Sequence, residues 1–435
     1  MTTTTNNEQK KLNVPNKREQ NQSCLDSAER EGLRPNGNVP NLRFPEFRGE
    51  WEKVRLGEEC NMLCGYAFNG EDIVEQGSYL LMRGINITEG SIRHSSELDR
   101  YYSGSIEKLD KYKLAIGDLV IGMDGSKVGR NSAIVSSYED GSYLVQRVCR
   151  IRSSIGNNYI LQFINNTKFH QYVDTVKTSS AIPHISLRDI KNYRISIPST
   201  QDETDKIAKL FLLLDERIAT QNKIIEDLKK LKSAISKHLF SRKDLLETTI
   251  RLADIAALKN GYAFQSSKYD TKGKWKILTI ANVSGERYIN DDDCNCIINL
   301  PNDIQDHQVL KEGDILISLT GNVGRVSLCK VGNYLLNQRV GLLHITKNVN
   351  QEFLYQVLSS RRFENSMVAC GQGAAQMNIS KGDVENFVLP YSSNGNSIRM
   401  IAGILQSYDV FTINELRILT LLTMQKQYLL HQMFI

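Results

Sequence analysis

Arginine and glutamine, two side chains that suit DNA bases, stand next to each other at two places in the sequence. Gln146 and Arg147 lie in the stretch "VQRV", and Gln338 and Arg339 lie in "NQRV". Arginine can bind guanine through two hydrogen bonds, and an amide side chain can bind adenine in the same way. The two arginines can instead brace the fold through ion pairs. The sequence leaves base contact and ion pairing open as alternatives.

Two further types of loop recur and carry polar or basic side chains. One is a glycine-rich turn at Asp124–Arg130 and again at Thr320–Arg325, whose N–H groups and cations suit a DNA phosphate. A β-hairpin that needs glycine for a positive φ angle also explains this turn, and the two explanations are compatible. The other loop, at 179–190 and 373–384, precedes an "IS" pair that opens a short helix, and its amide and imidazole groups suit base edges. The candidates from both loops are Lys127, Arg130, His184, Asn322, Arg325, Gln376 and Asn378.

The motifs of self-contained enzymes are missing from the sequence. There is no G-x-x-x-x-G-K-[ST] phosphate loop, no G-x-S-x-G elbow and no H-E-x-x-H. Without a Pro-Pro dipeptide the Asp/Asn-Pro-Pro-aromatic motif of an adenine methyltransferase is also absent. The eight cysteines do not resemble a disulfide framework, and none of their pairs is matched by a Cys/His pair at zinc spacing. We therefore expect neither a catalytic site nor a metal site.

Composition narrows the class of protein further. A chain of 435 residues with 40% hydrophobic residues can bury more than one core. The net charge of +5 is mild, so a nucleic-acid site must be a local patch. No run approaches 18 apolar residues, which argues against a membrane span, and the N-terminal residues lack an apolar signal core. We expect a cytoplasmic protein.

An internal repeat organises these loops. The tetrapeptide "GYAF" occurs at Gly65–Phe68 and again at Gly261–Phe264, 196 residues later. Other short matches, including the loops above, follow in the same order at offsets of 192 to 196 residues. The sequence therefore consists of two diverged copies of one unit. The aromatic residues of "GYAF" are expected to anchor the start of each domain rather than to contact a base or sugar.

Each copy ends in a segment that predicts a long helix with one narrow apolar seam. Apolar residues recur at alternating spacings of four and three for more than four heptads, as in a coiled coil, and Thr200 with Glu203 predicts a capping box at the first helix. The seam of the second helix repeats the first 194 residues later. Its polar members are Gln221, Lys232, Thr412, Glu415 and Lys426, and its apolar members are Ile207, Phe211, Leu214, Ile218, Ile225, Leu228, Ile235, Leu239, Ile401, Leu405, Tyr408, Leu419, Leu422, Leu429 and Met433.

The two helices are expected to be each other's partners. Each could pack on its own domain alone, but neither copy offers a second long helix. We predict a mixed α/β (α+β) fold in which two tandem globular domains are joined by an antiparallel coiled coil with pseudo-twofold symmetry. The expected boundaries are 1–40 for a polar, disordered tail, 41–198 for the first domain, 199–242 for the first helix, 243–394 for the second domain and 395–435 for the second helix.

The stretches "GYAF", "GDLVIGMDGSKVGR" and "NISKGDVENFVLP", together with the helix after them, resemble the DNA-specificity subunit of type I restriction–modification systems. The resemblance covers about residues 38–435 and rests on the order and spacing of the motifs. It implies that each domain is a target recognition domain that reads one half of a split DNA site. It also implies that the coiled coil sets the distance between the half-sites.

The resemblance implies partners as well. The specificity subunit is not itself an enzyme and binds double-stranded DNA without a cofactor of its own. It docks two methyltransferase subunits, which use S-adenosylmethionine to methylate adenine, and motor–nuclease subunits, which use ATP and Mg. A self-contained DNA-modifying enzyme and a coiled-coil scaffold without a DNA role are the alternatives.

Overall fold

The structure of the 435-residue chain is a computed structural model that describes residues 37–371 and 377–435. The chain divides into two compact units. Unit 1 combines the described residues up to Ile218 with Leu421–Ile435, and unit 2 is Ala219–Thr420. Each unit holds one copy of the internal repeat and a stretch of both long helices. None of the described helices has the length and apolar content needed to cross a membrane.

Unit 1 is built on an antiparallel sheet in the order β2–β11–β8–β9, with bounds Cys60–Cys64, Val148–Ser153, Leu119–Gly122 and Ser132–Ile134. The central strand β8 is buried on both faces, because Leu119 and Ile121 enter one core and Val120 enters another. The remaining strands are β10–β4–β7–β3 (Tyr143–Leu144, Tyr79–Met82, Tyr101–Tyr102, Ile73–Val74), β1–β12 (Glu52–Arg55, Arg194–Ile197) and β5–β6 (Ile87–Thr88, Ser91–Ile92).

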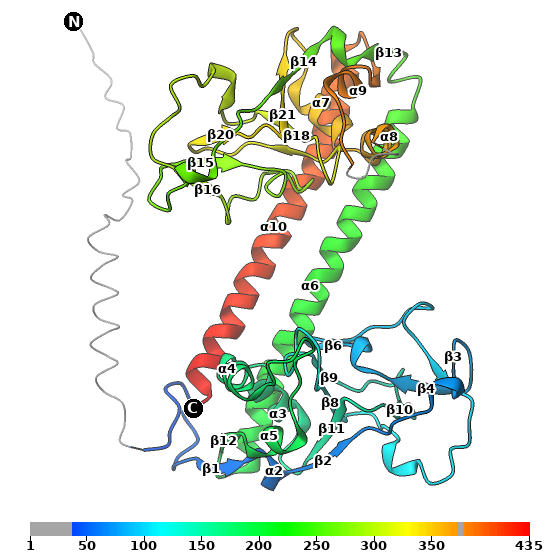
Figure 1. The fold of residues 1–435 in the computed structure, drawn as a ribbon, viewed down its shortest axis with the longest axis vertical. Helices are drawn as coiled ribbons and strands as arrows, with labels where there is room; N and C mark the ends of the chain where they lie inside the picture. Colours follow the sequence, from blue (N-terminus) through cyan, green and yellow to red (C-terminus); the bar gives the residue numbers. More distant parts are fainter. Residues whose placement is uncertain (1–36, 372–376) are drawn as a thin grey trace, which may run out of the picture. The chain divides into compact units, whose positions relative to one another are not determined.

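Helices cover one face of the β2–β11–β8–β9 sheet. They are α2 (Leu56–Glu59), α3 (Asn157–Ile164), α4 (Thr167–Val176) and α5 (Leu187–Asn192), and Figure 1 shows α3 and α5 beside β8 and β11. Phe163, Phe169 and Ile190 from these helices are buried in the same core as the strand residues. The packing of helices on one face and a second small core on the other gives unit 1 its mixed α/β character.

Unit 2 repeats this arrangement. Its main sheet has the order β14–β21–β18–β19, with bounds Ala256–Asn260, Val340–Ile345, Ile315–Ser318 and Val326–Leu328. A second sheet has the order β16–β15–β20–β17 (Asn295–Ile297, Trp275–Leu278, Tyr334–Leu336, Val309–Leu310), and β13 pairs with β22 (Thr248–Arg251, Val388–Tyr391). The helices are α7 (Gln351–Leu358), α8 (Arg361–Cys370) and α9 (Lys381–Glu385). The matching order of the main sheets confirms two tandem copies of one mixed α/β domain.

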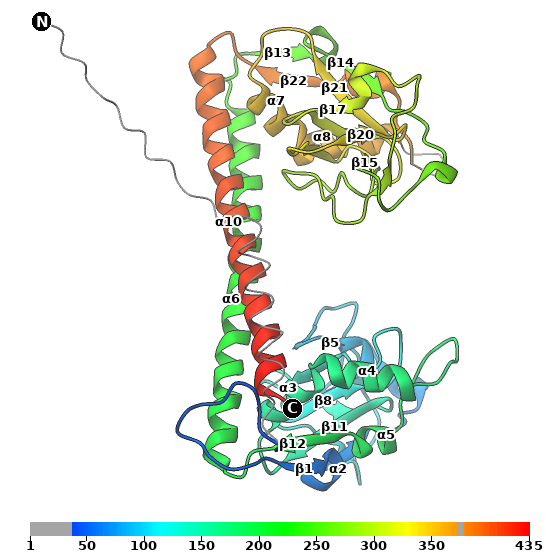
Figure 2. The same cartoon turned by 90° about the vertical axis from the view of Figure 1, so that its left-hand side faces the viewer.

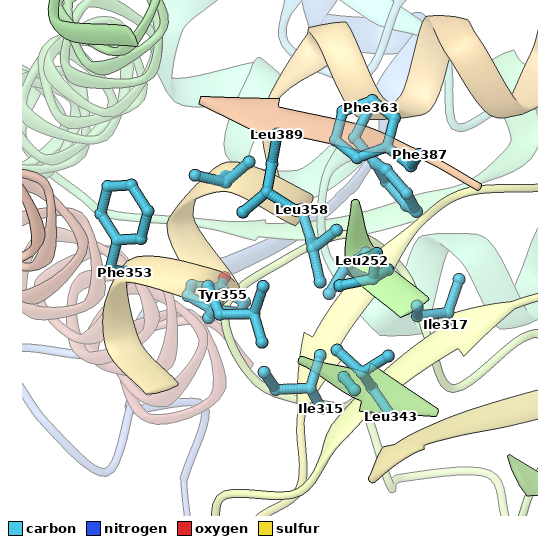
Figure 3. Close-up of a cluster of buried hydrophobic side chains, with 14 of the residues drawn as sticks. Leu252, Ile315, Ile317, Leu343, Phe353, Tyr355, Leu358, Phe363, Phe387 and Leu389 are labelled. Carbon is cyan, nitrogen blue, oxygen red and sulfur yellow. The ribbon is translucent and has the colours of Figure 1, made fainter. Parts of the chain in front are cut away.

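The main core of unit 2 lies between its sheet and its helices. Figure 3 shows Ile315, Ile317 and Leu343 from the strands meeting side chains of α7 and α8 such as Leu358 and Phe363. Leu358 and Phe363 are fully buried. Burying a large apolar side chain contributes about 1.5–3 kcal/mol, so this layer holds the loops at the sheet end in place.

The long helices α6 (Gln201–Ser241) and α10 (Gly395–Met433) run antiparallel. In unit 2, Gln221 contacts Glu415, and Lys232 contacts Asp409 further along α6. In unit 1 the ring of Phe211 meets that of Phe434, and Asp215 contacts Lys426. In both units, residues later in α6 contact residues earlier in the C-terminal segment that contains α10. Figures 1 and 2 show the two helices side by side within each unit. The antiparallel pairing predicted from the seams is confirmed.

The seam positions serve two kinds of packing. None of the fifteen apolar seam residues is exposed. Ile207 and Phe211 belong to the core of unit 1, while Leu239, Ile401 and Leu405 belong to the main core of unit 2. The ends of the helices therefore pack on a domain. Four of the five polar seam members, Gln221, Lys232, Glu415 and Lys426, pair helix with helix, whereas Thr412 donates to Tyr408 of its own helix. Packing on the domain and packing on the other helix are both present, in different stretches.

Two local expectations differ from the structure. The carboxylate of Glu203, which is fully buried, accepts two hydrogen bonds of 2.7 Å from Arg43 instead of closing a capping box with Thr200. Residues 37–40, which the sequence places in the polar tail, contact unit 1, because Pro40 is buried and the Asn38 amide bonds the Trp51 carbonyl. The rest of the predicted tail lies outside the described residues.

Candidate nucleic-acid interface

The recurring loops of each copy converge on one residue at the end of the central strand. In unit 1, Met123 follows β8, and its N–H donates to the carbonyl of Arg147 at 2.9 Å. Its own carbonyl accepts a hydrogen bond of 3.0 Å from the loop before α5. In unit 2, Leu319 holds the same place, with 3.1 Å to Arg339 and 2.9 Å to the loop before α9. The structure thus brings the three recurring loops together in both units.

The "GYAF" tetrapeptide is joined to the Gln–Arg loop by backbone packing. A Cβ on Gly65 would lie 2.1 Å from the Val145 carbonyl oxygen, and one on Gly261 would lie 2.2 Å from that of Asn337. The N–H of the tyrosine after each glycine donates to the neighbouring strand, at 2.9 Å in unit 1 and 2.8 Å in unit 2. Only glycine fits such an approach. The tetrapeptide recurs because it is the backbone support of the Gln–Arg loop.

The Gln–Arg pairs present their side chains to solvent. Gln146, Arg147, Gln338 and Arg339 are all exposed. Within the described part of the chain, none of these four side chains forms a salt bridge or a side-chain hydrogen bond. The described structure therefore gives no support to ion-pair bracing by the arginines, and both guanidinium groups are placed for a ligand.

Arg147 also has an unusual backbone. Its φ angle is +70°, in the left-handed region that a large side chain rarely adopts. The hydrogen bond from Met123 to its carbonyl and the one from Gly65 to the Val148 carbonyl, at 3.0 Å, hold this conformation. Strain held by surrounding contacts is typical of functional loops and costs about 1–3 kcal/mol.

The basic residues of the glycine-rich turns are paired with carboxylates. Lys127 lies 3.0 Å from Glu89, Arg130 lies 3.0 Å from Asp174, and Arg325 is 3.9 Å from a glutamate of α8. Each of these side chains is more than a third exposed, so such pairs contribute little stability and exchange readily for another anion.

The backbone of the turns is largely occupied. In unit 1 the N–H groups of Gly125, Val128, Gly129 and Arg130 donate to carbonyls of the protein. Gly125 and Gly129 have φ angles of +93° and +72°, and a Cβ on Gly129 would press on Val173 of α4 at 2.8 Å. The β-hairpin explanation therefore accounts for these glycines. The candidate phosphate contacts of this turn are therefore its side chains.

The loop before the short helix meets the turn in both units but carries different chemistry. Asp124 forms a β-bridge with His184, and Thr320 forms the same bridge with Asn378. His184 is half-buried with Nδ1 3.0 Å from the Thr178 hydroxyl, and Asn378 accepts a 3.0 Å hydrogen bond from Thr320. Asn322 is exposed on its turn, whereas Gln376 lies outside the described residues. The short helices begin with the capping boxes Ser186–Asp189 and Ser380–Asp383.

One feature of this face was not foreseen from the sequence. Cys64, directly before "GYAF", lies opposite Cys149 across β2 and β11. A hydrogen bond from Cys149 lowers the pKa of the Cys64 thiol to about 7, against the effect of burial, and the charges of Lys191 and Arg147 assist. The charge of Arg147 is the smallest of these contributions to the pKa of Cys64.

A family model described as the type I restriction modification DNA specificity domain matches residues 48–230 and 247–423. The chain belongs to this family. The two matched segments of the specificity domain correspond to the two copies of the repeat, each with much of one long helix. The match confirms the resemblance seen in the motifs.

Two curated relatives of this specificity-domain chain are specificity subunits. The chain is 29% identical over 179 residues to that of the type I restriction enzyme EcoAI from Escherichia coli, over 40% of this chain and 29% of that protein. It is 25% identical over 236 residues to that of the type I restriction enzyme MjaVIII from Methanocaldococcus jannaschii, over 48% of this chain and 54% of that protein. The chain thus spans less than a third of the length of one of these relatives and about half of the other.

Solved structures with the same fold cover most of the specificity-domain chain. The crystal structure of the type I restriction-modification system S subunit from M. genitalium matches with a TM-score of 0.58 and 17% identity, over 91% of this chain and 99% of that one. A chain from a study of complex assembly and conformational transition of the type I R-M system gives a TM-score of 0.50 and 16% identity, over 89% and 98%. At these identities the likeness establishes the fold.

Proposed function

We propose that this chain reads a split DNA target, one half-site with each unit, as the specificity subunit of a type I restriction–modification complex. Catalysis then belongs to other subunits. The observation that carries the proposal is the convergence of the same three loops at the same sheet end in both units, each with an exposed Gln–Arg pair. Such pairs suit guanine and adenine in the major groove.

The differences between the units suit two different half-sites. At the bridge between the turn and the following loop, unit 1 carries Asp124 and His184, while unit 2 carries Thr320 and Asn378. A carboxylate with an imidazole offers a different set of donors and acceptors from a hydroxyl with an amide. One backbone scaffold with exchanged polar groups is what reading two sequences requires.

Exposed apolar residues on the long helices support docking of protein partners. In unit 2, Val410 and Phe411 of α10 are 48% and 57% exposed, and in unit 1 Leu421, Met424 and Tyr428 are each more than 60% exposed. Exposed apolar residues close together on one helix suit a protein partner. We assign these surfaces to two methyltransferase subunits, with motor–nuclease subunits joining the complex.

In this assembly the cofactors belong to the partners. S-adenosylmethionine would bind the methyltransferase subunits, and ATP with Mg would bind the motor–nuclease subunits. The chain's own role is to place the DNA so that a methyltransferase can take an adenine out of the helix.

Methylation mapping tests the proposal. The chain is expressed with its methyltransferase subunits in a host without other adenine methylation, and modified adenines are mapped genome-wide. The expected result is one motif of two short half-sites separated by a gap of unread bases. Methylation at one continuous motif, or the same pattern without this chain, would contradict the proposal.

The two alternatives have their own tests. Transfer of labelled methyl groups from S-adenosylmethionine to DNA by the purified chain alone would favour a self-contained enzyme. The absence of salt-dependent DNA binding by the complex would favour a scaffold.

A further inference from the structure

A groove of about 1040 Å³ lies within unit 2, outside the recurring loops. Its walls are the part of α6 in this unit, the start of α8 and the loop around Gly285. Hydroxyl and amide groups line it, among them Ser233, Ser359 and Asn365. Side chains of these types, with Lys and Arg, make most protein contacts to DNA phosphates.

The groove carries more cations than anions. Seven lysines and arginines line it, against three carboxylates. The carboxylates are already engaged: Glu226 and Glu286 each pair with a lysine of α6, and Asp409 is shared by a lysine and an arginine. Lys237 and Arg361 are exposed and have no carboxylate partner within the described ranges, whereas the guanidinium of Arg362 donates to the Val388 carbonyl at 3.4 Å. The groove therefore has a local excess of positive charge.

The start of α8 adds backbone donors to this charge. The N-cap residue Ser360 makes no side-chain capping bond, and its hydroxyl donates to the Val357 carbonyl at 2.5 Å. The corresponding helix of unit 1, α4, is capped by Asn166, which accepts from the Lys168 N–H at 2.9 Å. The first turn of α8 carries two arginines and one glutamate, Glu364, and its uncapped start favours an anion.

A buried amide in the wall of the groove also lacks a partner. Gln356 is 1% exposed, and its Nε2 donates to Glu352 at 2.8 Å and to Asp409 at 2.7 Å. Its Oε1 has no hydrogen-bond partner among the described residues. A water molecule carried in with a hydrated phosphate would supply the missing donor.

The cation set belongs to unit 2 alone. The positions 194 residues before Arg361 and Arg362 are Thr167 and Lys168, and the position 194 residues after Lys237 is His431. Lys168 donates to the Phe434 carbonyl at 3.4 Å, so its charge is directed at the chain itself. Recurrence in the sequence therefore does not reveal the groove.

The groove begins beside the candidate DNA-contacting turn of unit 2. A Cβ on Gly285, which lines the groove, would lie 3.6 Å from Cγ of Arg325. Arg325 also faces Glu364 of α8 at 3.9 Å, next to Asn365 in the groove wall. A DNA strand on the recognition turn is thus led toward the groove, which favours DNA over an acidic protein as its ligand.

We propose that this groove binds backbone phosphates of DNA flanking the half-site read by unit 2, through Lys237, Arg361 and the first turn of α8. The inference rests on the proposed DNA-reading function. It adds a sequence-independent contact that only one of the two half-sites has. Such contacts hold the duplex in place and carry no base preference.

The salt dependence of DNA binding tests the inference. The complex with methyltransferase subunits is titrated with a duplex that contains the mapped target, at several salt concentrations. In the double variant Lys237→Ala/Arg361→Ala, the negative slope of log K against log salt should become less steep by about 1.8, since each lost phosphate contact removes about 0.9. The preference between target and altered targets should not change.

Two controls match this variant. Lys311→Ala/Lys347→Ala removes the same charge from exposed positions of unit 2 outside the groove and should leave the slope as in the wild type. Lys237→Arg/Arg361→Lys keeps the charge and should also keep the slope. If the first double variant proves unfolded, Lys237→Ala alone should make the negative slope less steep by about 0.9.

The outcomes separate the inference from the proposed function. An unchanged slope in the folded groove variant overturns the inference and leaves the function standing. Equal slope changes in the Lys311→Ala/Lys347→Ala control overturn it too. Loss of affinity for the methyltransferase subunits, with DNA binding intact, assigns the groove to an acidic protein. If the wild-type complex binds all DNA alike, the proposed function itself fails.

Discussion

Gln221 of α6 donates a hydrogen bond to Glu415 of α10, the residue that holds its own place in the second copy, 194 positions later. The amide Nε2 reaches the carboxylate and also the backbone carbonyl of Glu415, the latter at 3.1 Å. A residue that meets its own counterpart marks the pseudo-twofold axis of two antiparallel helices.

Two further pairs obey the same symmetry. In unit 1 Asp215 pairs with Lys426 at 2.5 Å, and in unit 2 Asp409 pairs with Lys232 at 2.5 Å. Asp409 follows Asp215 by 194 residues, and Lys426 follows Lys232 by the same interval. The polar seam residues thus select one register of α6 against α10, as polar residues in coiled-coil seams commonly do.

Replacing the central amide by an acid should destabilise the coiled coil. Gln221→Glu puts two carboxylates where an amide now donates to one, at a cost of about 1–3 kcal/mol at pH 7. Lowering the pH toward 4 protonates one of them, so the loss should shrink as the pH falls. Urea unfolding at both pH values measures this. Glu415→Gln, which makes a neutral pair, should show no such pH dependence, and an equal loss at both pH values would contradict the account.

Replacing the two aspartates of the flanking pairs should reduce the free energy of unfolding by different amounts. Asp409→Asn should cost about 1.5–3 kcal/mol, because it leaves Lys232 without a carboxylate and takes from the buried Arg287 one of its two, the other being Glu352. Asp215 is 34% exposed, pairs with Lys426 and accepts a hydrogen bond of 3.5 Å from Gln162, so Asp215→Asn should cost about 1 kcal/mol or less. Chemical denaturation of both variants gives the comparison. Equal losses would show that burial of the network does not decide its strength.

The "GYAF" glycines should tolerate no side chain. Gly65→Ala and Gly261→Ala force a Cβ within 2.2 Å of a carbonyl oxygen and should each cost about 1–3 kcal/mol or more. Each should impair recognition of one half-site, because each supports one Gln–Arg loop. Gly70→Ala is the control, since nothing lies within 4 Å of its added Cβ. Thermal unfolding and methylation mapping provide the readouts, and wild-type behaviour of Gly65→Ala would refute the packing argument.

The exposed arginines should each serve one half-site. Arg147→Ala and Arg339→Ala should relax one base position apiece, at about 1–3 kcal/mol of discrimination. Methylation mapping with each variant shows which half-site changes. A uniform loss on all sequences would instead indicate phosphate contact.

Cys64 offers an independent readout of Arg147. The pKa of its thiol lies near 7, with a contribution from the charge of Arg147. Thiolate formation, and with it the rate of alkylation, should reach half its maximum near pH 7 in the wild type and at a higher pH in Arg147→Ala. Arg339→Ala, in the other unit, should leave the profile in place.

The helices are predicted to set the gap between the half-sites. Seven residues added to both α6 and α10 preserve the seam and lengthen each helix by about 10 Å, or roughly three base pairs. The half-sites should stay the same while the unread gap grows. If the gap stayed the same while methylation activity was retained, the helices would not set the distance between the half-sites.

Some of this architecture was readable from the sequence, because the signals are local. The seam through Phe211 and Ile225 repeats every heptad, and its burial follows from that period. The pairing of Gln221 with Glu415 was not readable, since the heptad pattern does not say where two helices cross. The pattern does restrict polar seam residues to a few positions.

The candidate site divides in the same way. Recurrence pointed to Arg147 and Arg339, but the requirement for Gly65 comes from a strand about 80 residues later, which no local pattern reports. Lys237 and Arg361 could not be predicted as site residues from the repeat, because their counterparts, His431 and Thr167, are of other types. Comparing two copies of a repeat identifies the residues that both copies share, but not the functional residues that only one copy has.

The core of unit 1 includes Phe434, whose ring lies 4.8 Å from that of Phe163. These residues are separated by the whole of unit 2 in the order of synthesis. At about 5–20 residues per second, a ribosome needs roughly 10–40 s to make unit 2 alone. During that time part of the apolar surface of α3 is not yet covered by Phe434. Unit 2, in contrast, is made as one continuous segment. The domain whose synthesis begins first is therefore the one completed last.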